Sequence, residues 1–376
     1  MKICIDGLGV THLMTTGIGV YTYELLNGLF EMYPQATYEL LWNKTSSKLK
    51  CGKNIKVNYN DLNINRKENN LENLEKYILN NKINIYHSPN NGFSIPKNKV
   101  CYYITTVQDV LPIINSKDVD EKFLKKFHEV FENAMNQSDR IIAVSEYVKE
   151  ILRNNFNIPE KKIAVIYPGY SDMFKKMDEE SCENILKSKY KIQGDYILTV
   201  GSLHKRKNLE NLIKGFKEIS LYSHNKLKLV LVGEISGKRR DYYIELMMLI
   251  DKLDLVDSII FTGSVDYNDM VYFYSGAKCV INLSRCEGFS LSTIEAMACK
   301  TPVLCNEQTV FKEILGDTGV WLDANDKNNI VQGINEVLYN NNYKNEIIIK
   351  QSERVKKYNW SKSIIKTVHE YETWYD

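Results

Sequence analysis

The feature that most constrains the fold is the alternation of short apolar runs with longer segments of helical periodicity along the whole chain. Such alternation is typical of parallel sheets whose strands are covered on both faces by helices. In the first half the strand candidates are residues 2–6, 38–42, 55–59, 83–87, 100–107 and 140–144. In the second half they are residues 196–200, 228–232, 258–262, 279–283, 302–305 and 320–322. Each set is long enough for a doubly wound α/β sheet of its own.

A chain of 376 residues suits two domains better than one core. The break falls near Tyr167-Pro168-Gly169-Tyr170, where a strand ends in Pro-Gly and a polar stretch follows. We therefore predict a Rossmann-like domain over 1–170 and a second over 171–357. The remaining residues, 358–376, predict an amphipathic helix that opens at Asn359 or Ser361 and packs back on the first domain.

Composition excludes several classes of protein. The 49 basic residues nearly balance the 47 acidic ones, which argues against nucleic acid as a partner. The eight cysteines form no C-x-x-C pair, and several lie in apolar runs, which is typical of reduced thiols. The first residues enter a strand pattern without a signal-peptide pattern, and no apolar run approaches the length of a bilayer span. We expect a cytoplasmic protein, working in solution or at the inner face of the membrane.

A basic loop follows the first strand candidate of the second half. The segment VGSLHKRKNL contains Gly201 and Ser202, and a helix pattern begins near Asn208. The amides of that helix start, with the side chains of Arg206 and Lys207, would suit a diphosphate. Taken alone, the segment is more simply interpreted as a solvated basic turn.

A second loop of this half carries two carboxylates. Within SRCEGFSLSTIEAMA, Glu287 lies in the loop after a strand and Glu295 lies about one turn inside the following helix. Gly288 relaxes the turn between them. Open α/β sheets bind ligands at the carboxyl ends of their strands, and a helix carboxylate there can accept bonds from adjacent ribose hydroxyls. Without the rest of the chain, two unrelated exposed glutamates would be the simpler interpretation.

Together these segments resemble the donor-site motifs of family 4 glycosyltransferases, which have the GT-B fold. The E-x7-E pattern of that family matches Glu287 and Glu295, and its Arg-Lys-Asn element matches Arg206 to Asn208. Further agreement, in the expected order, lies in TGIGVY from Thr16, HSP from His87, Asp109 before Leu111-Pro112, AVSE from Ala143 and IYPG from Ile166. The resemblance spans nearly the whole chain. It implies a GT-B fold of two Rossmann-like domains facing a central cleft, the first shaping the acceptor site and the second holding a nucleotide-sugar.

The resemblance also implies roles for particular residues. Glu295 should bind the ribose, Glu287 the hydroxyls of the transferred sugar, and Arg206 with Lys207 the diphosphate. The amides of the segment after Glu287 should meet sugar and phosphate, and a glycine loop near the N-terminus should face the donor phosphates and the acceptor. The expected donor-binding residues are Gly17, Gly19, Ser202, Arg206, Lys207, Glu287, Gly288, Phe289, Ser290, Leu291 and Glu295.

One position departs from the family pattern. Many members carry a His immediately before the Asp in the segment that here reads Thr106-Val107-Gln108-Asp109. Gln108 does not titrate, so a His-assisted mechanism is in doubt at this position. With Glu287, Asp109 is the expected catalytic residue, because it can orient an acceptor hydroxyl or accept its proton. His87 and His12 are the alternatives.

No metal or other cofactor is expected. Asp118-Val119-Asp120 matches the D-x-D string of metal-dependent transferases of another fold, but it opens a helix pattern, where Asp is favoured for capping. The helix pattern over 121–134 is basic and amphipathic, and some family members dock on membranes through such a surface. The alternative is an ordinary helix that buries Phe123, Phe127, Val130 and Ala134.

The resulting hypothesis is a retaining glycosyltransferase that moves a hexose from a nucleotide-diphosphate sugar to a glycan, polysaccharide or lipid-linked acceptor. GDP-mannose is the first choice of donor, because the motifs resemble those of bacterial mannosyltransferases of glycan assembly. UDP-glucose, UDP-N-acetylglucosamine and dTDP-rhamnose stay open. The alternatives are a nucleotide-sugar 2-epimerase and a non-catalytic, transferase-like binding subunit. The acceptor, the linkage and the oligomeric state are not encoded in these motifs.

Overall fold

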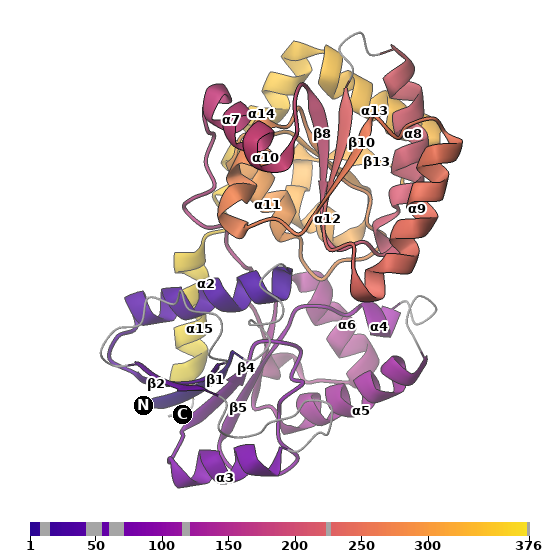
Figure 1. The fold of residues 1–376 in the computed structure, drawn as a ribbon. Helices are drawn as coiled ribbons and strands as arrows, with labels where there is room; N and C mark the ends of the chain where they lie inside the picture. The colour runs from indigo at the N-terminus through magenta and orange to yellow at the C-terminus, as the bar shows by residue number, and fades with distance from the viewer. Residues whose placement is uncertain (8–15, 43–54, 60–70, 115–120, 223–226, 374–376) are drawn as a thin grey trace. The chain divides into compact units, whose positions relative to one another are not determined.

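The computed structural model describes residues 1–7, 16–42, 55–59, 71–114, 121–222 and 227–373. The chain divides into two compact units. Unit 1 consists of Met1–Gly169 and Asn359–Asp376, and unit 2 of Tyr170–Tyr358. Helices lie against both faces of the sheet in each unit (Figure 1).

The described strands of unit 1 form a parallel sheet in the order β3-β2-β1-β4-β5-β6-β7. They are β1 (Lys2–Asp6), β2 (Thr37–Trp42), β3 (Ile55–Tyr59), β4 (Ile85–Ser88), β5 (Tyr102–Val107), β6 (Arg140–Ala143) and β7 (Ile163–Val165). The helices are α2 (Gly17–Met32), α3 (Glu72–Asn80), α4 (Leu111–Ile114), α5 (Glu121–Gln137), α6 (Glu146–Phe156), α15 (Trp360–Glu372) and the 3-10 turn η2 (Glu160–Lys162).

The described strands of unit 2 form a second parallel sheet in the order β10-β9-β8-β11-β12-β13. They are β8 (Tyr196–Val200), β9 (Lys228–Val232), β10 (Ile259–Gly263), β11 (Val280–Asn282), β12 (Val303–Asn306) and β13 (Val320–Leu322). The helices are α7 (Glu179–Tyr190), α8 (Leu209–Tyr222), α9 (Arg240–Lys252), α10 (Met270–Gly276), α11 (Leu291–Ala298), α12 (Thr309–Leu315), α13 (Lys327–Tyr339) and α14 (Asn341–Val355). The 3-10 turns are η3 (Lys205–Lys207), η4 (Gly237–Arg239), η5 (Tyr267–Asp269) and η6 (Gly316–Thr318).

The predicted pair of doubly wound parallel sheets is confirmed. One strand differs: β7 is absent from the six candidates of the first half, although it belongs to the run that ends at Pro168-Gly169. The strand is three residues long and lies at the edge of its sheet, so it offers too few residues for a periodicity to be read.

The C-terminal helix α15 packs on α2 within unit 1. The Asn359 side chain caps it by accepting a hydrogen bond from the Ser361 amide. A Cβ on Gly169 would stand 2.1 Å from the Trp360 nitrogen, so only glycine allows the chain to pass so close to the start of the helix. On the facing side, Ile364 is fully buried and fills the space where Gly28 of α2 has no side chain.

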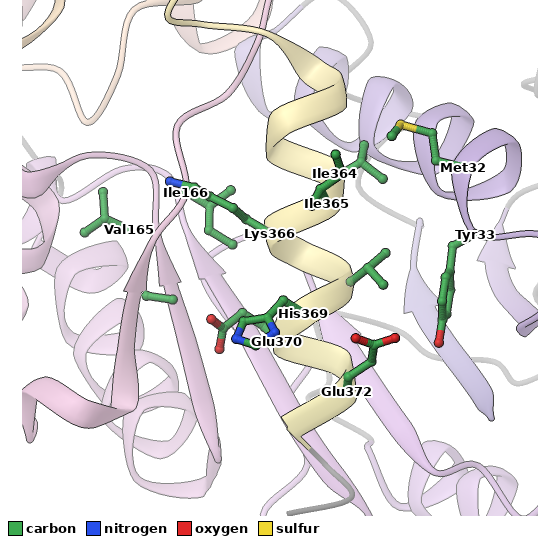
Figure 2. Close-up of a pocket in the computed structure, with 12 residues that line it drawn as sticks. Met32, Tyr33, Val165, Ile166, Ile364, Ile365, Lys366, His369, Glu370 and Glu372 are labelled. Atoms are coloured by element: carbon green, nitrogen blue, oxygen red, sulfur yellow. The ribbon is translucent and has the colours of Figure 1, made fainter.

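A groove of about 720 Å³ is lined by α15, the end of α2 and the segment 164–166. Figure 2 shows Met32 and Tyr33 on one side of the helix and Val165 and Ile166 on the other. None of the residues predicted to bind donor or acceptor lines it. The groove therefore does not correspond to the predicted site.

The basic helix α5 buries a different residue from the one expected. Phe127 and Ala134 are buried as predicted, but Val130 is only half-buried and its neighbour Phe131 is fully buried instead. The Phe131 ring stacks on that of Phe127, with their centroids 5.0 Å apart. The buried face of α5 thus contains Phe131 where Val130 was expected. The Phe123 side chain lies outside the described residues.

The packing of α15 leads to a test of stability. We expect Ile364→Ala to lower the free energy of unfolding by about 2–4 kcal/mol, because it leaves a cavity against α2. The matched control is Ile365→Ala, which removes the same atoms from a side chain that is 61% exposed. Urea unfolding of the two variants compares them directly, and equal midpoints would contradict the packing described here.

Candidate donor site

The loop after β8 is shaped by two glycines that lie against each other. Gly201 has a φ of +142°, which side chains rarely adopt, and a Cβ on it would stand 2.6 Å from the Lys207 Nζ. A Cβ on Gly233, which follows the neighbouring strand β9, would stand 2.0 Å from the Gly201 carbonyl oxygen. The Lys207 side chain therefore lies across Gly201, and Ser202 is half-buried beside it.

Glu287 is held between two cations. Its carboxylate forms an ion pair with the Arg206 guanidinium and another, at 2.7 Å, with the Lys207 Nζ. Glu287 and Lys207 are only 7% and 8% exposed. The three predicted residues are thus brought together, although Lys207 and Glu287 are 80 positions apart in the sequence.

This arrangement fixes the charge of Glu287. Burial by itself would raise the pKa of its carboxyl group, but the charges and hydrogen bonds of Arg206 and Lys207 outweigh burial and lower the pKa to about 2. Glu287 is therefore an ionised hydrogen-bond acceptor at neutral pH and does not serve as a proton donor.

The two loops are also joined through their backbones. The Arg285 amide donates to the Arg206 carbonyl at 2.8 Å, and the Arg206 guanidinium donates to the Cys286 carbonyl at 2.7 Å. Buried Asn208 adopts a left-handed conformation (φ 54°), accepts a bond from Arg285 and donates to the Ala324 carbonyl. Its role as a clamp between three loops was not predicted, because the sequence shows only an Asn before a helix.

The segment from Gly288 to Leu291 leads into α11. Ser290 is the N-cap residue of α11, but its hydroxyl makes no capping bond. Instead it accepts a hydrogen bond from the Asn282 amide group at 3.1 Å and lies 2.9 Å from the Thr293 hydroxyl. Gly288 is buried, while Leu291 is half-buried. The half-buried Phe289 ring packs edge-on against Tyr358. The helix start, with its partial positive charge, is thus held by a side chain at the end of β11.

Glu295 lies in the second turn of α11 and is 6% exposed. The hydroxyl of fully buried Tyr274 donates to its Oε2 atom at 2.7 Å. Burial raises the pKa of Tyr274 well above its usual value, and the charge of Glu295 raises it further, so the phenol stays protonated. Tyr274 comes from α10, and no sequence signal linked it to Glu295.

In unit 1, the predicted glycine loop lies at the start of α2. Gly17 is the first residue of the helix, and the Thr16 hydroxyl caps it by accepting a bond from the Gly19 amide at 3.4 Å. Gly19 is buried and Gly17 is exposed. Residues 8–15, which include His12, lie outside the described residues, as do Asp118 and Asp120.

Asp109 and Gln108 follow β5. The half-buried Asp109 accepts a hydrogen bond from the Leu111 amide at 2.8 Å, which caps the short helix α4. The Gln108 side chain donates to the Pro89 carbonyl, and the Asn91 side chain accepts from the amides of both Gln108 and Asp109. Gln108 therefore anchors the turn at the position where the sequence departs from the expected family pattern.

His87 is enclosed in the core of unit 1. One ring nitrogen lies 2.7 Å from the Tyr371 hydroxyl, and the other lies 2.8 Å from the Thr106 hydroxyl. Burial lowers its pKa to about 3, although the charge of Asp6 acts in the opposite direction. A neutral, fully enclosed imidazole joins β4, β5 and α15 and has no exposed atom for an acceptor. The structure therefore assigns His87 a structural role.

The described part of the chain contains no group of three or more His, Cys, Asp or Glu side chains that could bind a metal ion. Among the same residues, no helix has both the length and the apolar content to cross a bilayer.

Comparisons with known proteins define the class of protein. The family profile described as Glycosyltransferase Family 4 matches residues 15–172, and the profile described as Glycosyl transferases group 1 matches residues 183–355. Sucrose-phosphate synthase from Thermosynechococcus elongatus has the same fold, with a TM-score of 0.81 at 18% identity over 100% of this chain and 99% of that chain. The fold and the two matches define a glycosyltransferase with the GT-B fold.

Two curated relatives of the chain are bacterial enzymes named as mannosyltransferases. O-antigen chain mannosyltransferase B of Escherichia coli is 27% identical over 293 residues, which are 76% of this chain and 74% of the relative. O-antigen chain mannosyltransferase RfbU of Salmonella typhimurium is 27% identical over 224 residues, 59% of this chain and 57% of the relative. The chain thus spans less than two thirds of the second relative. The chain thus consists of a Glycosyltransferase Family 4 domain followed by a Glycosyl transferases group 1 domain, and it is an enzyme of the hexosyltransferase type.

The low pKa of Glu287 predicts a pH dependence of stability. Because folding lowers this pKa from 4.5 to about 2, the ion pairs stabilise the fold above about pH 4.5, and this contribution is lost as the pH falls toward 2. It amounts to about 3 kcal/mol. We expect the difference in unfolding free energy between wild type and Glu287→Gln to shrink by about that amount between pH 6 and pH 2.

Denaturant unfolding at a series of pH values measures this difference. Other carboxylates titrate equally in both proteins and cancel. The surface variant Glu346→Gln is the control, because its carboxylate is exposed on α14. A wild-type to Glu287→Gln difference that stays constant with pH would show that Glu287 has an ordinary pKa.

Proposed function

We propose that the protein is a retaining mannosyltransferase, which transfers mannose from GDP-mannose to a glycan or lipid-linked acceptor. The choice of mannose is supported by the two relatives, both named as O-antigen chain mannosyltransferases. The observation that carries the proposal is the buried cluster in which Arg206 and Lys207 flank Glu287.

The cluster suits the departure of a diphosphate. Two cations share one carboxylate, which leaves a net positive charge at the carboxyl end of β8 and β11. The negative charge on a leaving diphosphate increases as its bond to the sugar breaks, so Arg206 and Lys207 stabilise that state most strongly. Glu287, kept ionised, accepts hydrogen bonds from hydroxyls of the transferred sugar.

Retention follows if attack and departure occur on the same face of the sugar. The acceptor oxygen forms its bond to the anomeric carbon, the bond from that carbon to the phosphate oxygen breaks, and the acceptor proton passes to an oxygen of the leaving diphosphate. This route needs no protein nucleophile and no metal. The protein contributes position and charge.

Glu295 is the proposed ribose ligand. Tyr274 occupies one oxygen of its carboxylate and fixes the side chain rotamer. A carboxylate held in this way can accept bonds from adjacent ribose hydroxyls at little cost in conformational entropy.

On the acceptor side, Asp109 is the proposed residue that orients the attacking hydroxyl, and Gln108 positions its turn. Gly17 and Gly19 are proposed to face the donor phosphates. Contact of α5 with a membrane surface stays a prediction. None of the comparisons favours the 2-epimerase or a non-catalytic subunit, and product formation that requires an acceptor separates the transferase from both.

Measurements of donor binding and of sugar transfer distinguish the roles of Glu287 and Glu295. We expect Glu295→Gln to weaken nucleotide-sugar binding by about tenfold or more, because a ribose contact is lost. We expect Glu287→Gln to slow transfer by roughly a hundredfold, because its contacts lie at the reacting sugar. A thermal-shift screen against GDP-, UDP-, ADP- and dTDP-sugars selects the donor, and steady-state kinetics with it measure both effects.

Glu346→Gln is again the control and should retain wild-type kinetics. If Glu287→Gln and Glu295→Gln both kept full activity, the site assignment would be wrong. A larger thermal shift with a UDP- or dTDP-sugar than with GDP-mannose would overturn the choice of donor and leave the transferase assignment intact.

A further inference from the structure

Arg239 is a cation of unit 2 that the family motifs do not include. It ends the turn η4, which follows β9, and it is the residue before α9. Strand β9 is the direct neighbour of β8, whose loop carries Arg206 and Lys207. The two loops meet where Gly233 lies against Gly201. Arg239 therefore belongs to the same edge of the sheet as the predicted diphosphate ligands.

The environment of Arg239 lacks a countercharge. The side chain is half-buried, and among the described residues no carboxylate lies within ion-pair distance of its guanidinium. Two acids of the surrounding elements are engaged elsewhere. Glu234 accepts bonds from Ser236 and Ser264, and Glu245 pairs with Lys205 at 3.1 Å.

The charge that acts on the pKa of Arg239, that of Arg206, has the same sign. Burial lowers the pKa of the Arg239 guanidinium, and the charge of Arg206 lowers it further. A half-buried arginine without a carboxylate beside a second arginine raises the energy of the folded protein unless an anion binds there. This cost favours an anionic ligand as the partner of Arg239.

The charges of the loops suit a diphosphate. Arg206 and Lys207 share the carboxylate of Glu287, and Arg239 adds a further positive charge at the same edge of the sheet. The diphosphate of a nucleotide-sugar carries one negative charge on each phosphate. The released nucleoside diphosphate carries more charge on its terminal phosphate, so a third cation would favour the leaving group over the bound donor.

We propose that Arg239 is a third cation of the donor site, which binds the diphosphate of the donor and of the nucleoside diphosphate formed from it. This inference rests on the proposed function of unit 2. It deepens that function by assigning a specific ligand class to a residue outside the Arg-Lys-Asn and E-x7-E motifs. The group recognised is the phosphate and not the base or the sugar.

The test compares ligands that differ only in their phosphates. Calorimetric titration with GDP, GMP and guanosine, and with UDP, UMP and uridine, is carried out on wild type, Arg239→Gln and Arg240→Gln. Arg240 is adjacent and exposed, so Arg240→Gln removes the same charge from a side chain outside the proposed site. We expect Arg239→Gln to weaken binding of the diphosphate by roughly ten- to hundredfold, the monophosphate less, and the nucleoside within about twofold.

Arg240→Gln should bind all ligands like wild type, and Arg239→Lys, which keeps the charge, should recover part of the diphosphate affinity. Equal affinities of wild type and Arg239→Gln for the diphosphate would overturn the role of Arg239. So would an equal loss for diphosphate and nucleoside, because that pattern indicates a contact with the base or a distorted site. Failure of wild type to bind any of the nucleotides would instead overturn the proposed function itself.

Discussion

The ion pairs of Glu287 with Arg206 and Lys207 are the interaction on which the rest of the donor site depends. They join the loop after β8 to the loop after β11, and these strands are neighbours at the point where the strand order of unit 2 reverses. Open parallel sheets bind ligands at such a point. A buried carboxylate is costly without partners, and a buried lysine is likewise costly without an anion. Each group therefore makes the burial of the others possible, and a diphosphate meets charges that are already in position.

Close approach of the backbone makes the cluster possible. Lys207 reaches Glu287 across Gly201, which has no Cβ to obstruct it, and Gly201 in turn contacts Gly233. Asn208, in a left-handed conformation, ties the cationic loop to Arg285 and Ala324. In the Arg-Lys-Asn element, two residues thus carry charge and the third holds the loop in shape.

Much of the fold follows from patterns that are local in sequence. The short apolar runs predicted most strands of both sheets, and Asn359 predicted the start of α15, because burial on both faces and helix capping leave a signature within a few residues. Contacts between distant elements leave none. The bond from Tyr274 to Glu295, the clamp by Asn208 and the enclosure of His87 by Thr106 and Tyr371 depend on which strands and helices are neighbours. The burial of Phe131 in place of Val130 depends on the aromatic partner it meets.

The most decisive measurement for the donor site is a crystal structure of the protein with GDP-mannose bound. We expect the diphosphate oxygens to lie within hydrogen-bond distance of Arg206 and Lys207, with Glu287 facing the mannose hydroxyls and Glu295 facing the ribose. A donor bound elsewhere, with Glu287 still enclosed by its two cations and remote from the sugar, would show that the cluster is structural and would contradict its assignment to the donor site.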